Sequence, residues 1–382
     1  MKKKVLISGA GIAGMVCAIL LDKDKYDVEI IEQASQFRNI GFSIVMWKTG
    51  FEHLLSLLKK NYEHIVEGKD YFKLDGFKLF VGARLFLLKK FNVLGYGWAF
   101  ERTRLMKILE NVLHKQIPKQ QVSFSKTIRH IEYAQSQGGC ALVKFRDGTE
   151  SAYDVVIIAE GIHSSSRELV AVNERIISVP YALRYSWFAS PTNLGSYGGL
   201  FFTKGQVAVI HPPYFKNLLG FYFDKGLPRE LQSAFENSVR VCIKQLDGRE
   251  SSLDIQTSDV FELKEVHLDR YYSKNVVFIG DAAHGRPPTL GFGTSLALED
   301  AVFISRKLNE LNEISETEIT KAFQSYSDIR SKRVEDVYHV QNQIQKFYTK
   351  SAVKVIVLSL LTKLFLGDYM EYRIKKLASY TL

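Results

Sequence analysis

Two glycine-rich turns, far apart in the chain, contain the residues best suited to bind a large phosphorylated ligand. One turn occupies residues 9–14 and the other residues 280–293. In the first, Gly9 would allow a tight turn, Gly11 would let the backbone approach a pyrophosphate, and Gly14 would let a helix pack on a strand. Together the two turns predict a long ligand that is held at both ends.

The elements around the first turn are those that such a site requires. Residues 4–8 form an apolar run typical of a buried parallel strand, and residues 15–21 read as a helix whose N-terminus would face the phosphates. A second strand, residues 26–32, ends in Glu32, whose carboxylate could accept hydrogen bonds from a ribose 2'-hydroxyl. The ligand should therefore contain an adenosine ribose without a 2'-phosphate. The candidate binding residues here are Gly9, Gly11, Ile12, Ala13, Gly14 and Glu32.

The second turn indicates which dinucleotide binds. It follows a buried strand at residues 275–279, so Asp281 lies at the carboxyl end of the sheet, where it could bind a sugar alcohol. Thr294 or Ser295 could cap a helix that runs to about Leu308, and the N-terminus of that helix would face an electron-rich group. In a flavin this group is the N1–C2=O edge, so FAD is favoured over NAD. The candidates here are Asp281, Pro288, Gly291, Gly293, Thr294 and Ser295.

Three further segments occur in the order found in one enzyme family. Arg102 and Leu105 fit its Arg-x-x-Leu segment, residues 159–167 fit its Asp-Gly segment, and Gly41 after Arg38 fits a glycine-containing loop. With the two turns, these segments resemble the single-component FAD-dependent aromatic hydroxylases, the group A flavoprotein monooxygenases of the para-hydroxybenzoate hydroxylase type, which include tetracycline-inactivating monooxygenases. The resemblance covers most of the chain. It implies that FAD binds noncovalently and that Arg38, Gly41 and Arg102 lie near it.

The chain departs from the pattern of this family at several positions. Glu160 stands where the family has an aspartate, and Phe292 and Ser295 replace a glutamine and an asparagine in the second turn. These changes should alter contacts near the flavin ring but leave the backbone dipoles of the helix in place. The resemblance implies a structural role for His284, and it identifies no catalytic acid or base.

The resemblance also implies a monooxygenase reaction. NAD(P)H, as a transient co-substrate, would reduce FAD; dioxygen would add at flavin C4a, and the hydroperoxide would transfer its distal oxygen to an aromatic or enolic carbon. The expected substrate is a small aromatic or polyketide-like molecule. Two alternatives stay open. One is a flavin-dependent reductase or dehydrogenase without oxygen insertion, and the other is a noncatalytic flavin-binding protein.

Composition narrows the remaining possibilities. The 382 residues, 46% of them apolar, can bury a core and are enough for two joined domains. Cys17, Cys140 and Cys242 are too few and too widely spaced to indicate a disulfide framework or a metal site, which favours the cytoplasm. The formal charge of +10 comes with no recognised nucleic-acid module, so we expect a basic surface that attracts NAD(P)H and no nucleic-acid partner.

The expected fold class is α/β: a Rossmann-like FAD-binding domain with a β-sheet substrate domain inserted and a C-terminal helical segment. The FAD-binding domain should comprise residues 1–75, 100–175 and 275–310, the substrate domain residues 76–99 and 180–274, and the helical segment residues 311–382. The apolar stretch at residues 352–366 is short for a membrane span and contains two lysines. We expect it to pack across the two domains, with contact at a membrane surface as the less favoured alternative.

The insertion reads as a sheet. Residues 200–203 and 206–210 form a predicted hairpin, and residues 218–223 a third strand. This sheet would roof the flavin and form the substrate pocket. The candidates to face the substrate are Arg184, Tyr185, Phe201, His211 and Tyr222.

Overall fold

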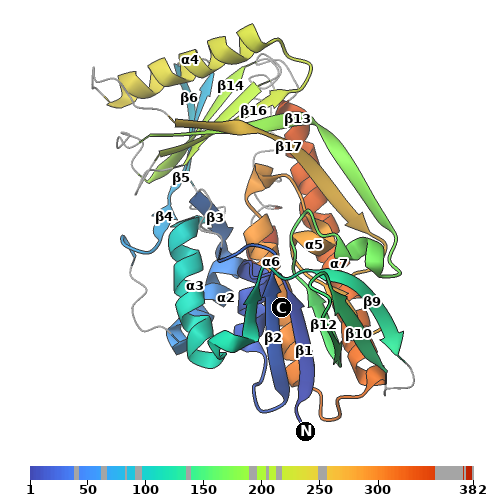
Figure 1. The fold of residues 1–382 in the computed structure, drawn as a ribbon. Helices are drawn as coiled ribbons and strands as arrows, with labels where there is room; N and C mark the ends of the chain where they lie inside the picture. The colour runs from blue at the N-terminus through green and yellow to red at the C-terminus, as the bar shows by residue number, and fades with distance from the viewer. Residues whose placement is uncertain are drawn as a thin grey trace.

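The computed structural model arranges the chain in two parts, an α/β body and a seven-stranded sheet above it (Figure 1). The described residues are 1–37, 43–61, 67–81, 84–90, 97–134, 139–188, 196–203, 206–211, 217–247, 256–348, 373 and 376–380. Three of the sequence predictions, those on Arg38, on Gly41 and on residues 352–366, lie outside the described residues.

The α/β body is built on a six-stranded sheet in the order β18-β19-β12-β1-β2-β8. These strands are β1 (Lys3–Ser8), β2 (Tyr26–Glu32), β8 (Val122–Phe124), β12 (Val155–Ile158), β18 (Tyr272–Ser273) and β19 (Val276–Phe278). β18 is antiparallel to β19, and the other neighbours are parallel. All of β12 is buried, as expected of a parallel strand with both faces covered. The strands predicted at residues 4–8, 26–32 and 275–279 are confirmed in this sheet.

Helices α1 (Ile12–Leu20) and α6 (Gly293–Asn309) pack on each other in this body. The hydroxyl of Tyr26 donates to the carbonyl of Leu308 at 2.6 Å, and Nδ2 of Asn309 donates to the carbonyl of Leu20 at 2.9 Å. These bonds bring the two glycine turns into one body. The remaining helices are α2 (Lys48–Asn61), α3 (Arg102–Gln116), α4 (Arg229–Asp247), α5 (Asp281–His284) and α7 (Glu316–Tyr348), with short turns η1 (Lys119–Gln121), η3 (Ser166–Leu169) and η4 (Pro288–Leu290).

Two three-stranded sheets complete the body. One has the order β11-β10-β9 and the other β3-β7-β4. Their strands are β3 (Ser43–Trp47), β4 (Phe72–Leu74), β7 (Gly97–Glu101), β9 (Ile128–Ala134), β10 (Cys140–Phe145) and β11 (Glu150–Tyr153). β7 leads directly into α3, so this small sheet fixes where the N-terminus of α3 lies.

The seven-stranded sheet has the order β17-β13-β16-β15-β14-β5-β6. Its strands are β5 (Gly76–Val81), β6 (Arg84–Lys90), β13 (Glu174–Phe188), β14 (Tyr197–Thr203), β15 (Gln206–His211), β16 (Asn217–Asp224) and β17 (Gln256–Leu268). The predicted hairpin and third strand are confirmed as β14, β15 and β16. Figure 1 shows α4 across the outer face of this sheet, while β13 and β17 run down beside the α/β body.

The start of α6 differs from the prediction in one respect. Its N-cap is Phe292, and no side chain forms a capping hydrogen bond. Because the helix begins at Gly293, Thr294 and Ser295 already lie inside its first turn, so the predicted cap is wrong. Instead, Oγ of buried Ser295 accepts a hydrogen bond from the backbone N–H of Trp47 at 3.1 Å. In the part of the chain that the structure describes, no helix has the length and apolar character needed to cross a membrane.

Candidate functional site

The first glycine turn leaves open the space that a pyrophosphate needs. A Cβ placed on Gly9 would collide with the carbonyl of Ala159, and one on Gly14 would collide with the carbonyl of Gly9. By contrast, a Cβ on Gly11 would meet no atom within 4 Å. The turn is thus tightly packed where it contacts the rest of the protein and open beside the N-terminus of α1. Ile12 and Ala13 begin this helix, and the unpaired N–H groups of its first turn favour an anion.

Glu32 lies at this open turn. Its Oε2 accepts the backbone N–H of Ala10 at 3.0 Å, and its Oε1 accepts that of Ala34 at 2.9 Å. These two bonds hold the carboxylate at the turn, where it could accept hydrogen bonds from ribose hydroxyls. The geometry of Gly11, α1 and Glu32 therefore fits the adenosine and pyrophosphate half of FAD.

The second turn presents a similar opening. Gly280 has φ +61°, a value that favours glycine, and it turns the chain so that Asp281 begins α5. Asp281, Pro288 and Gly293 are all exposed, and a Cβ on Gly293 would meet only Oδ1 of Asp281, at 3.9 Å. The N-terminus of α6 and the Asp281 carboxylate thus border one space, which fits the polar edge and the sugar alcohol of a flavin.

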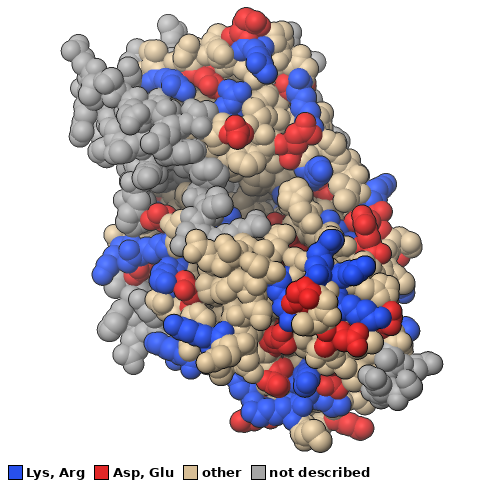
Figure 2. All heavy atoms as spheres, in the orientation of Figure 1, with Lys and Arg blue, Asp and Glu red and all other residues tan. Residues whose placement is uncertain are grey.

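Asp281 is exposed to solvent but has many protein atoms around it. The protein around it raises its pKa, and His284 and then Arg102 act in the opposite direction. Burial likewise raises the pKa of Tyr185 to about 12, and Arg102 again opposes the rise. The charge of Arg102, the first residue of α3, therefore acts on a residue of the second turn and on a residue of the seven-stranded sheet. Figure 2 shows the surface hollowed at the level where these two parts meet.

Strand alternation decides which predicted substrate residues face this region. In the pairing of β13 with β16, Tyr185 lies opposite Gly220 and Leu183 lies opposite Tyr222, so Tyr185 and Tyr222 share one face. That face is opposite to the one covered by α4 (Figure 1). We call the two tyrosines, with Tyr181 and Leu183 beside them, the tyrosine wall.

Arg184 and Phe201 lie on the other face, which corrects their predicted contact with substrate. Nη1 of Arg184 donates to Oε1 of Glu236 in α4 at 2.8 Å. Phe201 is fully buried, and its ring stacks on that of Phe80 at a centroid distance of 4.5 Å. The pleat of the sheet turns both residues toward α4.

The remaining predicted residues occupy the borders of the site. Gly291 has φ +67° and packs against Val45, while Thr294 is partly buried in the first turn of α6. His211 ends β15 in register with Leu218, and its side chain lies outside the described part. Within the described ranges, no group of three or more His, Cys, Asp or Glu side chains could hold a metal ion.

Glu160 forms hydrogen bonds within its own loop and to the end of β1. Its carboxylate accepts hydrogen bonds from the hydroxyls of Ser8, Ser164 and Ser166 at 2.6, 2.7 and 2.7 Å. Ser8 ends β1 next to the first turn, so Glu160 joins that turn to the loop after β12. Its side chain therefore acts here as a structural anchor.

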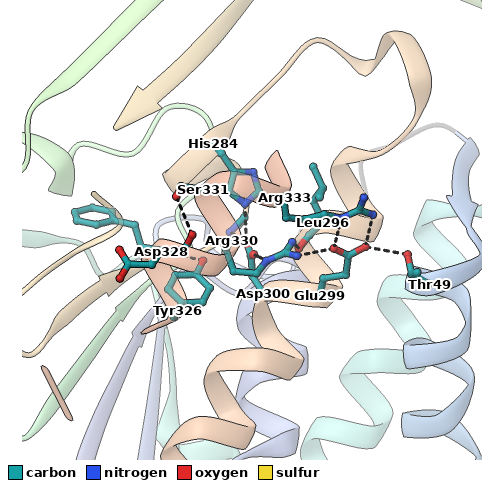
Figure 3. A network of polar contacts seen from close by, with 12 residues as sticks. Thr49, His284, Leu296, Glu299, Asp300, Tyr326, Asp328, Arg330, Ser331 and Arg333 are labelled. Atoms are coloured by element: carbon teal, nitrogen blue, oxygen red, sulfur yellow. Dashed lines mark hydrogen bonds and ion pairs between the residues drawn. The ribbon is translucent and has the colours of Figure 1, made fainter. Parts of the chain in front are cut away.

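A buried network behind the second turn was not predicted (Figure 3). Arg330 of α7 is fully buried, with its Nε 2.7 Å from Oδ1 of Asp300 and its Nη1 2.6 Å from Oε2 of Glu299. The other oxygen of Asp300 accepts the N–H of Gly280 at 2.8 Å and lies 2.6 Å from Nε2 of His284. His284 thus has a structural role. Asp300 fixes the backbone of Gly280, the residue directly before Asp281.

Arg333 extends this network toward the C-terminal part of the chain. It contacts Glu299 at 3.1 Å and donates to the carbonyl of Leu377 at 2.6 Å. Burial alone would raise the pKa of Glu299, but Arg330 and then Arg333 outweigh it and lower the pKa. The sequence contained one signal for this network: two adjacent acids lie inside the apolar run Leu296–Ile304. Carboxylates buried in this way need cationic partners elsewhere in the chain.

We expect Asp281→Ala to weaken FAD binding by about 1.5–3 kcal/mol, because a charged acceptor for the sugar alcohol is lost. Titration of the apoprotein with FAD, followed by flavin fluorescence, measures the change. Asp147→Ala is the matched control, since Asp147 is an exposed carboxylate in the hairpin between β10 and β11. A dissociation constant for Asp281→Ala equal to that of the control would contradict the assignment.

Comparisons with known proteins agree with this geometry. Residues 222–341 match the FAD binding domain, and residues 7–67 match the NAD(P)-binding Rossmann-like domain. The chain is 26% identical to 6-methylsalicylate 1-monooxygenase atA of Aspergillus terreus, over 87% of this chain and 80% of the relative. It is 25% identical to FAD-dependent urate hydroxylase of Mycolicibacterium vanbaalenii, over 87% of this chain and 86% of the relative.

Solved structures with the same fold include an FAD complex. HpxO of Klebsiella pneumoniae, solved with FAD and uric acid, superposes with a TM-score of 0.78 at 19% identity, covering 98% of this chain and 96% of that one. The tetracycline destructase Tet(51) superposes with a TM-score of 0.68 at 17% identity, covering 99% and 97%.

Proposed function

We propose that this chain, an FAD-dependent enzyme related to the monooxygenases and hydroxylases, uses NAD(P)H and dioxygen to hydroxylate an aromatic or enolic small molecule. The observation that carries the proposal is the open space at the second turn, where a Cβ on Gly293 would meet only Oδ1 of Asp281, at 3.9 Å. The charge of Arg102 acts both on Asp281, at the proposed flavin edge, and on Tyr185 of the tyrosine wall. A molecule held against that wall would lie beside the flavin.

The residues of the chain have binding roles in this proposal. Gly11 and the N-terminus of α1 would hold the pyrophosphate, Glu32 the ribose, and Asp281 the sugar alcohol. FAD, when bound, supplies the redox chemistry: it accepts electrons from NAD(P)H and passes them to dioxygen. The N-terminus of α6 would favour negative charge at the N1–C2=O edge of a bound flavin.

The seven-stranded sheet would orient the substrate and keep water away from the reaction. Tyr185 and Tyr222 are proposed to contact the substrate, because they occupy the face opposite α4. The pKa of Tyr185 is raised to about 12 by burial, so its hydroxyl stays protonated and can donate to a substrate oxygen. A planar substrate with a hydroxyl or enolate oxygen suits an aromatic wall of this kind.

The relatives suggest which molecules to try first. One acts on 6-methylsalicylate and another on urate by their names, and both compounds are small planar rings with oxygen substituents. We propose the same substrate class here, with polyketide-like molecules as its larger members. The proposed location is the cytoplasm, where NAD(P)H is supplied.

Labelled dioxygen tests the proposed reaction. Purified FAD-loaded protein is incubated with NADH or NADPH, ¹⁸O₂ and each of a panel containing 6-methylsalicylate, urate and tetracycline, and products are analysed by mass spectrometry. We expect one substrate to accelerate NAD(P)H oxidation and to gain one labelled oxygen atom. A parallel reaction in H₂¹⁸O with ordinary dioxygen should give unlabelled product. Turnover of a substrate without label from ¹⁸O₂ would instead favour a flavin-dependent reductase or dehydrogenase.

A further inference from the structure

A cluster of side chains holds the loop after α5 against both the sheet and α7. We call Glu265 and His267 of β17, Arg286 of the loop and Tyr338 of α7 the Arg286 clamp. None of these residues has a role in the proposed reaction. They nevertheless lie next to the second glycine turn, because Arg286 follows Asp281 by five positions and lines the same pocket as Asp281 and Gly293.

The backbone of the loop pairs with β17. The N–H of Val266 donates to the carbonyl of Gly285 at 2.9 Å, and Nη1 of Arg286 donates to the carbonyl of Val266 at 2.5 Å. On the other side, Nε2 of Gln341 in α7 donates to the carbonyl of Pro287 at 3.1 Å. The loop is therefore fixed at three successive residues, 285, 286 and 287.

The side chains of the clamp complete one connected set. The guanidinium of Arg286 lies 4.4 Å above the ring of Tyr338, whose hydroxyl donates to Oε2 of Glu265 at 2.6 Å. Nη2 of Arg286 is 3.3 Å from Nδ1 of His267, and Nε2 of His267 is 3.3 Å from Oε2 of Glu265. Because arginine can only donate, Nδ1 of His267 accepts, and its Nε2–H points to Glu265.

The same strand reaches the tyrosine wall. Val266 pairs with Ile176 of β13 at the lower end of β17, and Phe261 pairs with Leu183 of the wall higher up. The backbone N–H of Tyr185 also donates to Oγ of Ser258, in the upper part of β17, at 3.0 Å. One continuous strand thus joins the proposed substrate face to the loop beside Asp281.

We propose that Arg286 is a positioning residue for the flavin: by clamping residues 285–287 between β17 and α7, it sets the position of Asp281 and keeps the flavin edge in register with the tyrosine wall. Two further observations support this. The N–H of Gly285 donates to the carbonyl of Asp281 at 3.1 Å, so the clamped loop holds the Asp281 backbone directly. The positive charge of Arg286 also acts on the carboxylate of Asp281.

The test compares four variants of the full chain: Arg286→Met, Arg286→Lys, Tyr338→Phe and Arg270→Met. Arg270 is the matched control, because it lies just beyond β17 and donates to the carbonyl of Ala171 at 2.7 Å outside the clamp. For each variant we measure the FAD dissociation constant by fluorescence and the midpoint potential of bound FAD by reductive titration. Neither readout depends on hydroxylation, so failure of the proposed function leaves this test intact.

We expect Arg286→Met to weaken FAD binding about tenfold, the loss of about 1.4 kcal/mol, and to shift the midpoint potential to a more negative value because a nearby positive charge is removed. Arg286→Lys keeps the charge but cannot lie flat on Tyr338 while donating to two acceptors. It should restore the potential and leave FAD binding weak. Tyr338→Phe, which removes the bond to Glu265 but keeps the ring under Arg286, should weaken FAD binding to a smaller extent.

Two outcomes overturn the proposal. One is that Arg286→Met has the same FAD affinity and potential as Arg270→Met. The other is that Arg286→Lys restores both the FAD affinity and the midpoint potential. The positive charge alone, and not the clamp, would then explain the effect of Arg286. Circular dichroism and thermal melting of each apoprotein identify any variant that fails to fold. If Arg286→Met fails to fold, Tyr338→Phe, which retains the ring and the guanidinium contact, decides the question. An FAD affinity of Tyr338→Phe equal to that of Arg270→Met would then overturn the proposal.

Discussion

Replacing Arg330 with methionine should destabilise the protein by about 3–5 kcal/mol, which is the usual cost of removing one partner from a buried ion pair. Arg330 is fully buried and contacts Asp300 at 2.7 Å and Glu299 at 2.6 Å. Methionine would fill most of its volume but leave two buried carboxylates with less compensating charge. The free energy of unfolding in urea, with and without FAD, measures the effect.

The control for this experiment is Arg306→Met. Arg306 is an exposed arginine on α6, 4.0 Å from Glu310, and a pair of this kind contributes at most about 1 kcal/mol. The double variant Asp300→Asn, Arg330→Met should be more stable than the sum of the single changes implies, because the two residues interact directly. Equal stability of Arg330→Met and Arg306→Met would show that the network does not stabilise the fold.

Acid should diminish the difference between wild type and Arg330→Met. Burial alone would raise the pKa of Asp300, but His284 and Arg330 outweigh it and lower the pKa from 3.8 to about 2. Because the folded pKa is below the ordinary value, the stabilisation by ionised Asp300 is present above about pH 4 and is lost as the pH falls through about 2. The same urea titrations repeated at pH 5 and pH 3 follow this loss.

Gly11→Val should abolish FAD binding while leaving the fold intact. Gly11 has φ −76° and ψ −176°, which valine adopts without strain, and a Cβ there meets nothing within 4 Å. The new side chain would instead occupy the space proposed for the pyrophosphate. We expect the FAD dissociation constant to rise by more than about 100-fold, or about 2.7 kcal/mol. Fluorescence titration measures binding, and thermal melting of the apoprotein should match wild type.

Gly226→Val provides a control for the added bulk. Gly226 lies in an exposed turn after β16, where a Cβ would meet only the side chain of Asp224 at 3.3 Å. This variant should bind FAD like wild type. If Gly11→Val keeps the wild-type dissociation constant, the open space at the first turn does not hold the pyrophosphate.

The parallel sheet and both glycine turns could be predicted because their signals are local. β12 is a continuous apolar run, β1 contains the apolar run Val5–Ile7, and β2 alternates apolar and acidic residues before it ends in Glu32. One partner of Glu32 in the structure, the N–H of Ala10, is itself part of the first glycine turn. Short-range patterns of this kind are complete within a few dozen residues and need no knowledge of tertiary packing.

The residues that face the substrate were predicted less well. Side chains alternate between the two faces of a strand, and the sequence does not say which face a helix covers. The sequence analysis named both Arg184 and Tyr185 as residues that face the substrate. The structure places them next to each other on β13, and the position of α4 shows that Arg184 faces Glu236 while Tyr185 faces the α/β body. The buried network escaped prediction for a related reason. Arg330 lies 30 positions after Asp300 on a different helix, so no short motif contains the pair.

The bonds between Tyr26 and Leu308, and between Leu20 and Asn309, also determine when the protein can fold on the ribosome. Until α6 has been translated, α1 lacks the helix on which it packs, and β12 lacks its partner β19. At about 5–20 residues per second, roughly 15–60 s of synthesis separate the first turn from that point. During this interval the N-terminal strands lack part of their packing, and we expect the protein to capture FAD only after translation has passed residue 309.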